Sequence, residues 1–292
     1  MSEKVITSYK AFDKNMQCRN FQYEVGKEYE MDGEIKCCNR GFHACKSPME
    51  VLDHYDMLSS RFAEVEQSGK IDEEENSTKV CSSHIKIKAE LKLADIIKVG
   101  VEWLKDITSS SKVNADGALN DNGDRKKQIG SSGDSAQIGS SGYSAKICSS
   151  GDSAKIGSSG DYAQIGSSGY YAQIGSSGYS AKIGSSGDSA KICSSGYSAK
   201  ICSSGYSAKI CSSGDSAQIG ITGEDSVIMC AGKESKAKAK AGSWITLAEW
   251  KWSDEKNRNV PICVKTEYVD GNNIKADTWY QLKNGEFVEV TE

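Results

Sequence analysis

The residues with the clearest capacity for chemistry are cysteines and histidines in the first third of the chain. They are Cys37, Cys38, His43, Cys45, Cys81 and His84, the last two separated by two residues. Structural zinc sites favour closely paired Cys and His ligands. The four residues that could compose such a site, if the fold brings them together, are Cys37, Cys45, Cys81 and His84. Small buried thiols and a hydrogen-bonded histidine explain the same residues without a metal, and we favour that interpretation. We therefore expect no metal ion and no cofactor.

A second group of candidates follows from the order of elements in residues 1–108. A tyrosine-containing first strand, a Gly-Phe-His strand at 41–43, an immediate helix and then Phe62-Ala-Glu-Val resemble in order the ADP-ribosyltransferase-like fold. That resemblance implies a nicotinamide pocket shaped by strand and helix, and a later glutamate that handles the ribose. The matching positions are Tyr9, His43, Tyr55 and Glu64 or Glu66. The first strand has no His or Arg where that family's motif needs one, and no Ser-Thr-Ser follows. Enzyme activity is therefore the alternative hypothesis, because fold analogy alone does not establish it.

These candidates precede a nine-residue repeat that determines the architecture. Isoleucine recurs at positions 129, 138, 147, 156, 165, 174, 183, 192, 201 and 210, with looser copies at 219 and 228. Glycine holds the fifth place of each unit and alanine the eighth, as in Gly133 and Ala136. A fixed short period is the signature of a solenoid.

Each unit predicts a short strand followed by a corner. Ala-x-Ile-x-Ser alternates, so Ala, Ile and the first Ser share one face. The Ser-Gly-Asp/Tyr-Ser stretch favours a turn in which Gly adopts positive φ. Because one unit cannot enclose a core, we expect two units per coil in a parallel β-solenoid, with layers about 4.8 Å apart. The core should be Ile flanked by Ala, with serine hydroxyls paired along the stack.

The repeat also excludes several chemistries. In the nine-residue repeat of the calcium-binding β-roll, the Asp ligand stands one position later than the Asp of this repeat. Half of the units here have Tyr at that position instead, and Tyr cannot replace a carboxylate ligand. Residues 129–227 contain six Lys, six Asp and one Glu, so we expect no nucleic-acid partner. A Ser-His-Asp catalytic site is not supported, because all three His lie outside the repeat.

The segments around the repeat complete a mainly β protein. We expect an α+β domain at 1–108, a linker or irregular first coil at 109–128, the solenoid at 129–242 and an antiparallel β cap at 243–292. In the first domain we expect strands at 5–12, 23–34, 61–67 and 84–91, a helix that Ser47 caps and a helix over 93–104. In the cap we expect strands at 244–252 and 262–269, and a hairpin across Asn284-Gly285.

Charge and composition give weaker constraints. The 292-residue chain has a net charge of −4, and its N-terminus lacks the apolar segment of a signal peptide. No apolar run reaches the roughly 18 residues of a membrane helix, so we expect no membrane partner and a cytoplasmic location. The eleven cysteines are then expected as free thiols, with Cys193 and Cys211 stacked one coil apart.

Motifs at both ends resemble a family of uncharacterised bacterial and prophage-encoded proteins. They are Tyr9-Lys-Ala-Phe, Cys18 and Gly41-Phe-His-Ala-Cys45 before the repeats, and Ser235-Lys-Ala-Lys, Trp244, Leu247-Ala-Glu-Trp, Asp277-Thr-Trp-Tyr-Gln-Leu and Gly285-Glu-Phe-Val-Glu after them. The resemblance covers nearly the whole chain. It implies a mobile-element origin and brings no assigned activity.

Tyrosines at the corners suggest a binding surface. They are Tyr143, Tyr162, Tyr170, Tyr171, Tyr179, Tyr197 and Tyr206. Tyrosine gives a large contact area at low ordering cost, although rings that merely stack along the solenoid would explain the same pattern. We expect a non-enzymatic scaffold that binds a host or defence protein. A structural fibre or virion component, built from copies of the chain, is the other alternative.

Overall fold

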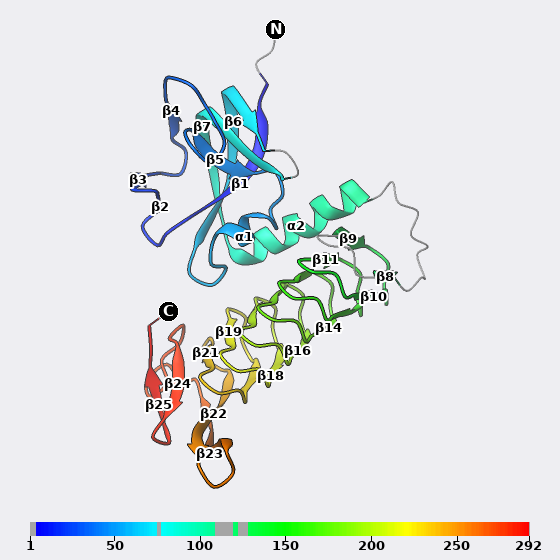
Figure 1. The fold of residues 1–292 in the computed structure, drawn as a ribbon, viewed down its shortest axis with the longest axis vertical. Coiled ribbons are helices and arrows are strands. Elements are labelled where there is room, and N and C mark those ends of the chain that lie inside the picture. Colours follow the sequence, from blue (N-terminus) through cyan, green and yellow to red (C-terminus); the bar gives the residue numbers. More distant parts are fainter. Residues whose placement is uncertain (1–3, 75–76, 109–118, 122–127, 292) are drawn as a thin grey trace. The chain divides into compact units, whose positions relative to one another are not determined.

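The computed structural model describes residues 4–74, 77–108, 119–121 and 128–291 and divides the chain into two compact units, Met1–Trp103 and Leu104–Glu292 (Figure 1). The elements from the N-terminus are β1 (Ile6–Phe12), β2 (Gln17–Cys18), β3 (Phe21–Gln22), β4 (Glu28–Glu30), β5 (Phe42–Cys45), α1 (Val51–His54), β6 (Arg61–Glu73), β7 (Lys79–Leu91) and α2 (Leu93–Thr108), which crosses the division between the units. None of the helices in the described part of the chain is long and apolar enough to span a bilayer.

The first unit is an antiparallel sheet that closes on itself. The strand order is β4-β7-β5-β1-β6, and β6 also pairs with β7, so β1, β5, β7 and β6 form a ring. The hairpin of β6 and β7 has thirteen residues in each strand, and register shifts after Glu64 and Ser68 bend it. The interior is filled by Phe12, Phe42, Val65 and other buried apolar side chains. Closure of the sheet places β1 beside β5, and residues of both strands line a pocket in this unit.

Two expected elements of this unit are shorter in the structure. The helix expected after Ser47 is the single turn α1; Glu50 precedes it, and no side chain of the described residues caps it. The Glu50 carboxylate instead accepts a hydrogen bond from the Ser77 hydroxyl at 2.6 Å, which ties this segment to the start of β7. The strand expected over 23–34 contracts to β4, whereas β6 continues to Glu73, beyond the strand expected at 61–67.

The repeat forms a parallel β-solenoid with two sheets, as its period predicts (Figure 1). Even-numbered strands from β8 to β22 stack in one sheet, and odd-numbered strands from β9 to β21 stack in the other. Stacked partners come from alternate units: Ile138 lies opposite Ile156, and Ile147 opposite Ile165. The isoleucines of the two sheets form one buried cluster, with the alanines buried beside them. Two nine-residue units per coil are therefore confirmed.

The strands of the second unit are β8 (Leu119–Asp121), β9 (Gln128–Ser131), β10 (Gln137–Ser140), β11 (Lys146–Ser149), β12 (Lys155–Ser158), β13 (Gln164–Ser167), β14 (Gln173–Ser176), β15 (Lys182–Ser185), β16 (Lys191–Ser194), β17 (Lys200–Ser203), β18 (Lys209–Ser212), β19 (Gln218–Ile221), β20 (Val227–Cys230), β21 (Lys236–Lys238), β22 (Trp244–Ser253), β23 (Arg258–Tyr268), β24 (Tyr280–Lys283) and β25 (Glu286–Glu289).

Each corner turns at the residue after the Asp or Tyr, and the expectation that the repeat glycine adopts positive φ is wrong. The turning residue, from Ser135 through Ser216, has φ between 52° and 57°. The repeat glycine serves another purpose: a Cβ on Gly151 would collide with the carbonyl group of Gly133 in the previous coil. Glycine is thus required at this position because successive corners stack closely, and not because it can adopt positive φ.

The polar residues of the coil also behave differently from expectation. Among the described residues, seven buried inward hydroxyls have no hydrogen-bond partner, so they do not pair along the stack: those of Ser149, Ser158, Ser167, Ser176, Ser185, Ser203 and Ser212. The corner aspartates, in contrast, connect successive coils. The Asp188 carboxylate accepts a hydrogen bond from the amide N–H of Tyr206 at 2.8 Å, and Asp161 does the same for Tyr179. Asp at a corner is therefore a structural residue.

Antiparallel hairpins end both sheets, as expected for the cap. β22 runs parallel to β20 and then pairs with β23, whereas β24 pairs with both β21 and β25. Asn284 and Gly285 join β24 to β25 with positive φ, which is typical of a tight hairpin turn. At the other end β8 pairs in parallel with β10, so residues 119–121 belong to a further coil. The remainder of the expected linker, 109–118 and 122–127, lies outside the described residues.

Candidate functional site

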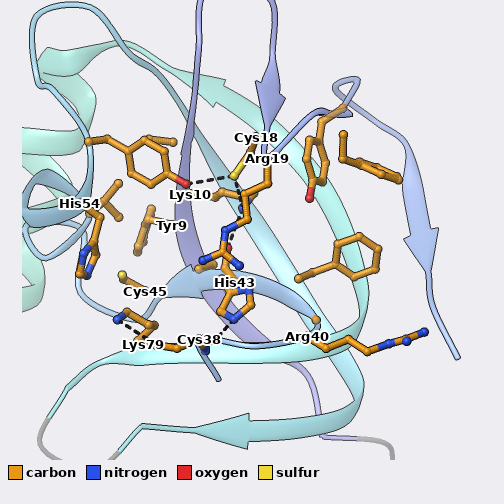
Figure 2. A pocket seen from close by; sticks show the side chains of 18 of the residues that line it. Tyr9, Lys10, Cys18, Arg19, Cys38, Arg40, His43, Cys45, His54 and Lys79 are labelled. Atoms are coloured by element: carbon orange, nitrogen blue, oxygen red, sulfur yellow. Dashed lines mark hydrogen bonds between the residues drawn. The ribbon is translucent and has the colours of Figure 1, made fainter. Parts of the chain in front are cut away.

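A pocket of about 640 Å³ opens in the first unit (Figure 2). It is lined by β1, the hairpin of β2 and β3, the loop before β5, β5 itself, α1 and the start of β7. Its cationic side chains are Lys10, Arg19, Arg40 and Lys79, and none of the described residues that line it is an aspartate or glutamate. The pocket is therefore electropositive, although the chain as a whole carries a net charge of −4.

Lys10 is the most unusual of these residues because it is almost completely buried. Only 3% of its surface is exposed. Its Nζ donates a hydrogen bond to the carbonyl oxygen of His43 at 2.8 Å and lies 3.5 Å from the Cys18 sulfur. The same nitrogen lies 5.3 Å and 5.6 Å from the ring centroids of Tyr23 and Phe12. No carboxylate in the described part of the chain pairs with it, and burial lowers the pKa of this amine.

Cys18 connects Lys10 to a half-buried tyrosine. The Cys18 sulfur lies 3.0 Å from the hydroxyl oxygen of Tyr55. Burial raises the pKa of the Tyr55 phenol, so the hydroxyl keeps its proton at neutral pH. Lys10, Cys18 and Tyr55 thus form a polar chain that runs from the carbonyl of His43 to the end of α1 (Figure 2).

His43 is held as a neutral imidazole. Its Nε2 accepts a hydrogen bond from the backbone N–H of Cys38 at 2.9 Å, which requires an unprotonated nitrogen. Burial lowers the pKa of the ring, and the nearby cations Arg19 and Lys10 lower it further. His43 therefore contributes a polar but uncharged edge to the pocket at neutral pH.

The turn between β2 and β3 carries Arg19 to the pocket. Cys18 lies opposite Phe21, and the two residues between them, Arg19 and Asn20, have φ of 51° and 62°. Such two-residue hairpins usually contain glycine or asparagine, because a side chain like that of arginine is disfavoured at positive φ. Figure 2 shows Arg19 between Lys10 and His43, whereas Arg40 extends away from them.

The structure brings together some of the residues suggested by the transferase resemblance. Tyr9, His43 and Tyr55 all line this pocket. Glu64 and Glu66 are not in its lining. Glu64 lies opposite Tyr9 in the pairing of β1 with β6, where its charge adds to burial in raising the pKa of Tyr9. Glu66 forms an ion pair with Lys88 at 2.7 Å.

The four residues suggested as zinc ligands do not form one cluster in the described part of the chain. The Cys37 and Cys81 thiols donate hydrogen bonds to the carbonyl oxygens of Asp72 and Arg40, at 3.2 Å and 3.0 Å. Burial raises the pKa of these thiols to about 11 and about 12. Cys45 lines the pocket instead. His84 is hydrogen-bonded through Nδ1 to the Ser68 hydroxyl at 2.8 Å.

Sequence reasoning missed Lys10, Cys18 and Arg19 as pocket residues. One signal was present: Lys10 stands inside a strand between Tyr9 and Ala11, all of which are buried. A lysine embedded in an otherwise buried strand indicates an unusual environment, because lysine is almost never fully buried without a partner.

The second candidate site is a column of rings on one edge of the solenoid. We call Tyr143, Tyr162, Tyr179 and Tyr197 the tyrosine column. Successive ring centroids are 5.3, 5.6 and 5.3 Å apart, and the last pair is stacked with an interplanar angle of 10°. Each side chain remains 44–49% exposed. The corners on the other edge carry Tyr170, Tyr171 and Tyr206, which are more exposed.

Two of these tyrosines occupy backbone positions that disfavour them. Tyr162 and Tyr171 have φ of 57° and 56°, where most units have serine. A bulky side chain at positive φ is uncommon and carries strain. These two rings are therefore present despite the local backbone, which suggests a role outside folding.

Comparison with known proteins adds one match. Residues 6–99 match the model of a family described as a domain of unknown function (DUF7666), which agrees with an uncharacterised family for this part of the chain. No curated protein and no solved structure matches the chain. The function of the protein must therefore be inferred from its fold and from the geometry of the two sites.

Proposed function

We propose that the protein is a non-enzymatic scaffold whose solenoid presents the tyrosine column to a protein partner. The observation that carries this proposal is the column itself: four rings, each in contact with the next and nearly half exposed, on a stack of similar coils. Rings fixed by their neighbours lose little entropy on binding, and tyrosine is enriched where protein interfaces gain most of their energy.

The chemistry of the edge suggests what the partner offers. Asp161 and Asp215 are corner residues on the same edge as the column. Tyrosine faces attract cations, and carboxylates add to that attraction. A surface with exposed arginine side chains fits this edge best. On the resemblance to prophage-encoded proteins, we further propose that this partner is a host or defence protein.

The strain at Tyr162 supports binding over simple shielding of the coil. Most repeats use serine at this position, so shielding does not require a ring there. The coil between those of Tyr143 and Tyr179 has Asp161 at the corner instead of a tyrosine. Tyr162 supplies a ring in that coil and contacts both Tyr143 and Tyr179. Without it the column would be interrupted.

Matched variants on the two edges test the proposal. Tyr162→Ser with Tyr179→Ala removes the middle of the column, whereas Tyr170→Ala with Tyr206→Ala removes two rings from the other edge that are not at positive φ. Tagged wild type and both variants are used to capture partners from the native host, and the enriched protein is purified and its Kd measured directly. We expect the column variant to weaken binding at least roughly tenfold, the size of a hot-spot loss, and the other variant to bind as wild type.

Unchanged affinity in the column variant, at an unchanged circular dichroism spectrum, would reject the proposal. The fibre alternative makes a different prediction, because it requires a stable assembly of identical chains. Analytical ultracentrifugation of the purified wild type separates the two: a fibre component sediments as a trimer or larger, whereas the scaffold needs no such assembly.

A further inference from the structure

The pocket of the first unit has a charge imbalance that its own described residues do not resolve. The Lys79 ammonium is paired with the carboxylate of Glu74 at 2.9 Å. The Arg40 guanidinium has no carboxylate partner among the described residues, but it donates to the carbonyl oxygen of Asp32 at 2.7 Å and extends away from Lys10 and His43 (Figure 2). Lys10 and Arg19 remain, and no carboxylate of the described residues pairs with either one. Two cations in this part of the chain therefore face one cavity without a counter-charge.

Burial makes this imbalance costly at Lys10. A buried ammonium loses its hydration, and a pair with a carboxylate normally compensates for that loss. Here the partners are the carbonyl of His43, the Cys18 thiol and the faces of two rings. These are dipoles and quadrupoles, not charges. An anion in the pocket would supply the missing charge.

Arg19 lines the pocket from a backbone conformation, at positive φ, that disfavours its side chain. The turn of Arg19 and Asn20 would be relaxed with glycine or asparagine at both positions. A strained arginine persists where the surrounding structure holds it, and such positions concentrate at ligand sites. Its guanidinium can bind a carboxylate or phosphate with two parallel hydrogen bonds.

Another part of the pocket lining is aromatic. Phe21, Tyr23 and Phe42 have ring centroids 4.8 Å (Phe21 to Tyr23) and 5.9 Å (Phe21 to Phe42) apart. Phe21 is 42% exposed although it belongs to this cluster. A volume of about 640 Å³ lies in the range of pockets for small molecules. An apolar wall beside a few fixed polar groups is typical of such sites.

We propose that this pocket binds a small aromatic anion, with its carboxylate or phosphate between Lys10 and Arg19 and its ring against Phe21, Tyr23 and Phe42. The anion completes the charge of the buried ammonium, and the ring covers the exposed face of Phe21. A metal ion is disfavoured by the same arrangement, because two cations and no carboxylate of the described residues face the cavity. This site is independent of the tyrosine column.

Three probe molecules distinguish the contribution of the aromatic ring from that of the anionic group. Benzoate and phenyl phosphate carry the ring with either anion, and benzyl alcohol carries the ring without charge. Binding to the full-length protein is measured by isothermal titration calorimetry and by ligand-observed NMR. We expect one or both anions to bind at least roughly tenfold more tightly than benzyl alcohol, since a charge-assisted hydrogen bond contributes that much. The tighter anion identifies the carboxylate or the phosphate class.

Two variants locate the anion. Lys10→Met removes the ammonium and keeps the length of the side chain, and Arg19→Asn removes the guanidinium and suits the positive φ of the turn. Each should weaken the tighter anion roughly tenfold or more and leave benzyl alcohol unchanged. Lys27→Gln is the matched control, because Lys27 is exposed and does not line the pocket. If Lys10→Met fails to fold, Arg19→Asn alone decides.

The proposal would be overturned by any of three results. These are benzyl alcohol binding as tightly as both anions, no anion binding at ten-millimolar concentration, and equal weakening by Lys27→Gln and Arg19→Asn.

Discussion

A Cβ atom added to Gly151 would collide with the carbonyl group of Gly133, which lies directly beneath it in the previous coil. The same close approach recurs at Gly160 over Gly142 and along the rest of the array. The spacing of stacked corners is therefore set by a contact between backbone atoms, and no change of side-chain rotamer can relieve a clash there.

Gly151→Ala should destabilise the solenoid by roughly 1–3 kcal/mol, the usual cost of an overpacked site. Gly175→Ala is the control, because a Cβ at Gly175 meets nothing within 4 Å, and it should change the free energy of unfolding by less than about 0.5 kcal/mol. Chemical denaturation followed by circular dichroism measures both. Equal stability of the two variants would contradict the stacking argument.

The corner aspartate Asp188 should contribute to stability through its hydrogen bond to the amide of Tyr206. Asp188→Ala leaves that amide without its acceptor and should cost about 1 kcal/mol. Asp188→Asn keeps a side-chain oxygen at the same place and should recover most of the loss. Thermal unfolding of the three proteins gives the comparison. An asparagine variant as unstable as the alanine variant would show that the negative charge, not the acceptor, is what matters.

Cys193 and Cys211 should form a disulfide under mild oxidation. Their sulfur atoms lie 2.8 Å apart on paired strands, and Cys193 is exposed. Peptide mapping after diamide treatment should find the 193–211 link, and Cys193→Ser should abolish it.

Cys230 is buried, with a thiol pKa raised to about 12 by burial, and should resist alkylation in the folded protein. Labelling of Cys230 as fast as Cys193 would contradict this arrangement.

Lys10 should make stability depend on pH in alkaline solution. Its pKa in the folded protein is lowered by burial from the ordinary 10.5, with Cys18 and Cys45 opposing and Arg19 adding to the shift. Between the folded pKa and 10.5 the unfolded chain binds more protons, so the stability contributed by Lys10 rises with pH across that range and is lost as pH falls through the folded pKa.

Lys10→Met removes this dependence. The free energy of unfolding of wild type minus that of the variant should therefore increase with pH from the lowered pKa of Lys10 in the folded protein up to about 10.5. Groups that titrate alike in both proteins cancel in the difference. A difference that stays constant, or that falls with pH, would show that Lys10 is not a desolvated amine.

The architecture was largely predictable because its determinants are local and repeated. The period of Ile138, Ile147 and Ile156 indicates a solenoid, and alternation around each Ile indicates which side chains are buried. The role of the glycines was not predictable in the same way. A turn needs positive φ somewhere, and only the stacked coils show that the residue after Asp or Tyr supplies it, while glycine allows the close approach.

The site was predictable only in part. Tyr9, His43 and Tyr55 were selected from the order of elements, and they do converge on one pocket. Lys10, Cys18 and Arg19 were missed, because their relation depends on closure of a sheet in which β1 meets β5. The hydrogen bond from Lys10 to His43 joins residues 33 positions apart. No local pattern encodes that contact.

The sequence by itself thus determined the solenoid, its two units per coil and its tyrosine corners, because a nine-residue period repeats the same local choice in every layer. Only the tertiary structure decided that four of the tyrosines touch as a column and that two cations face one pocket without a counter-charge from the described residues. Both relations join side chains from separate strands and turns, and their distances are set by how those elements pack.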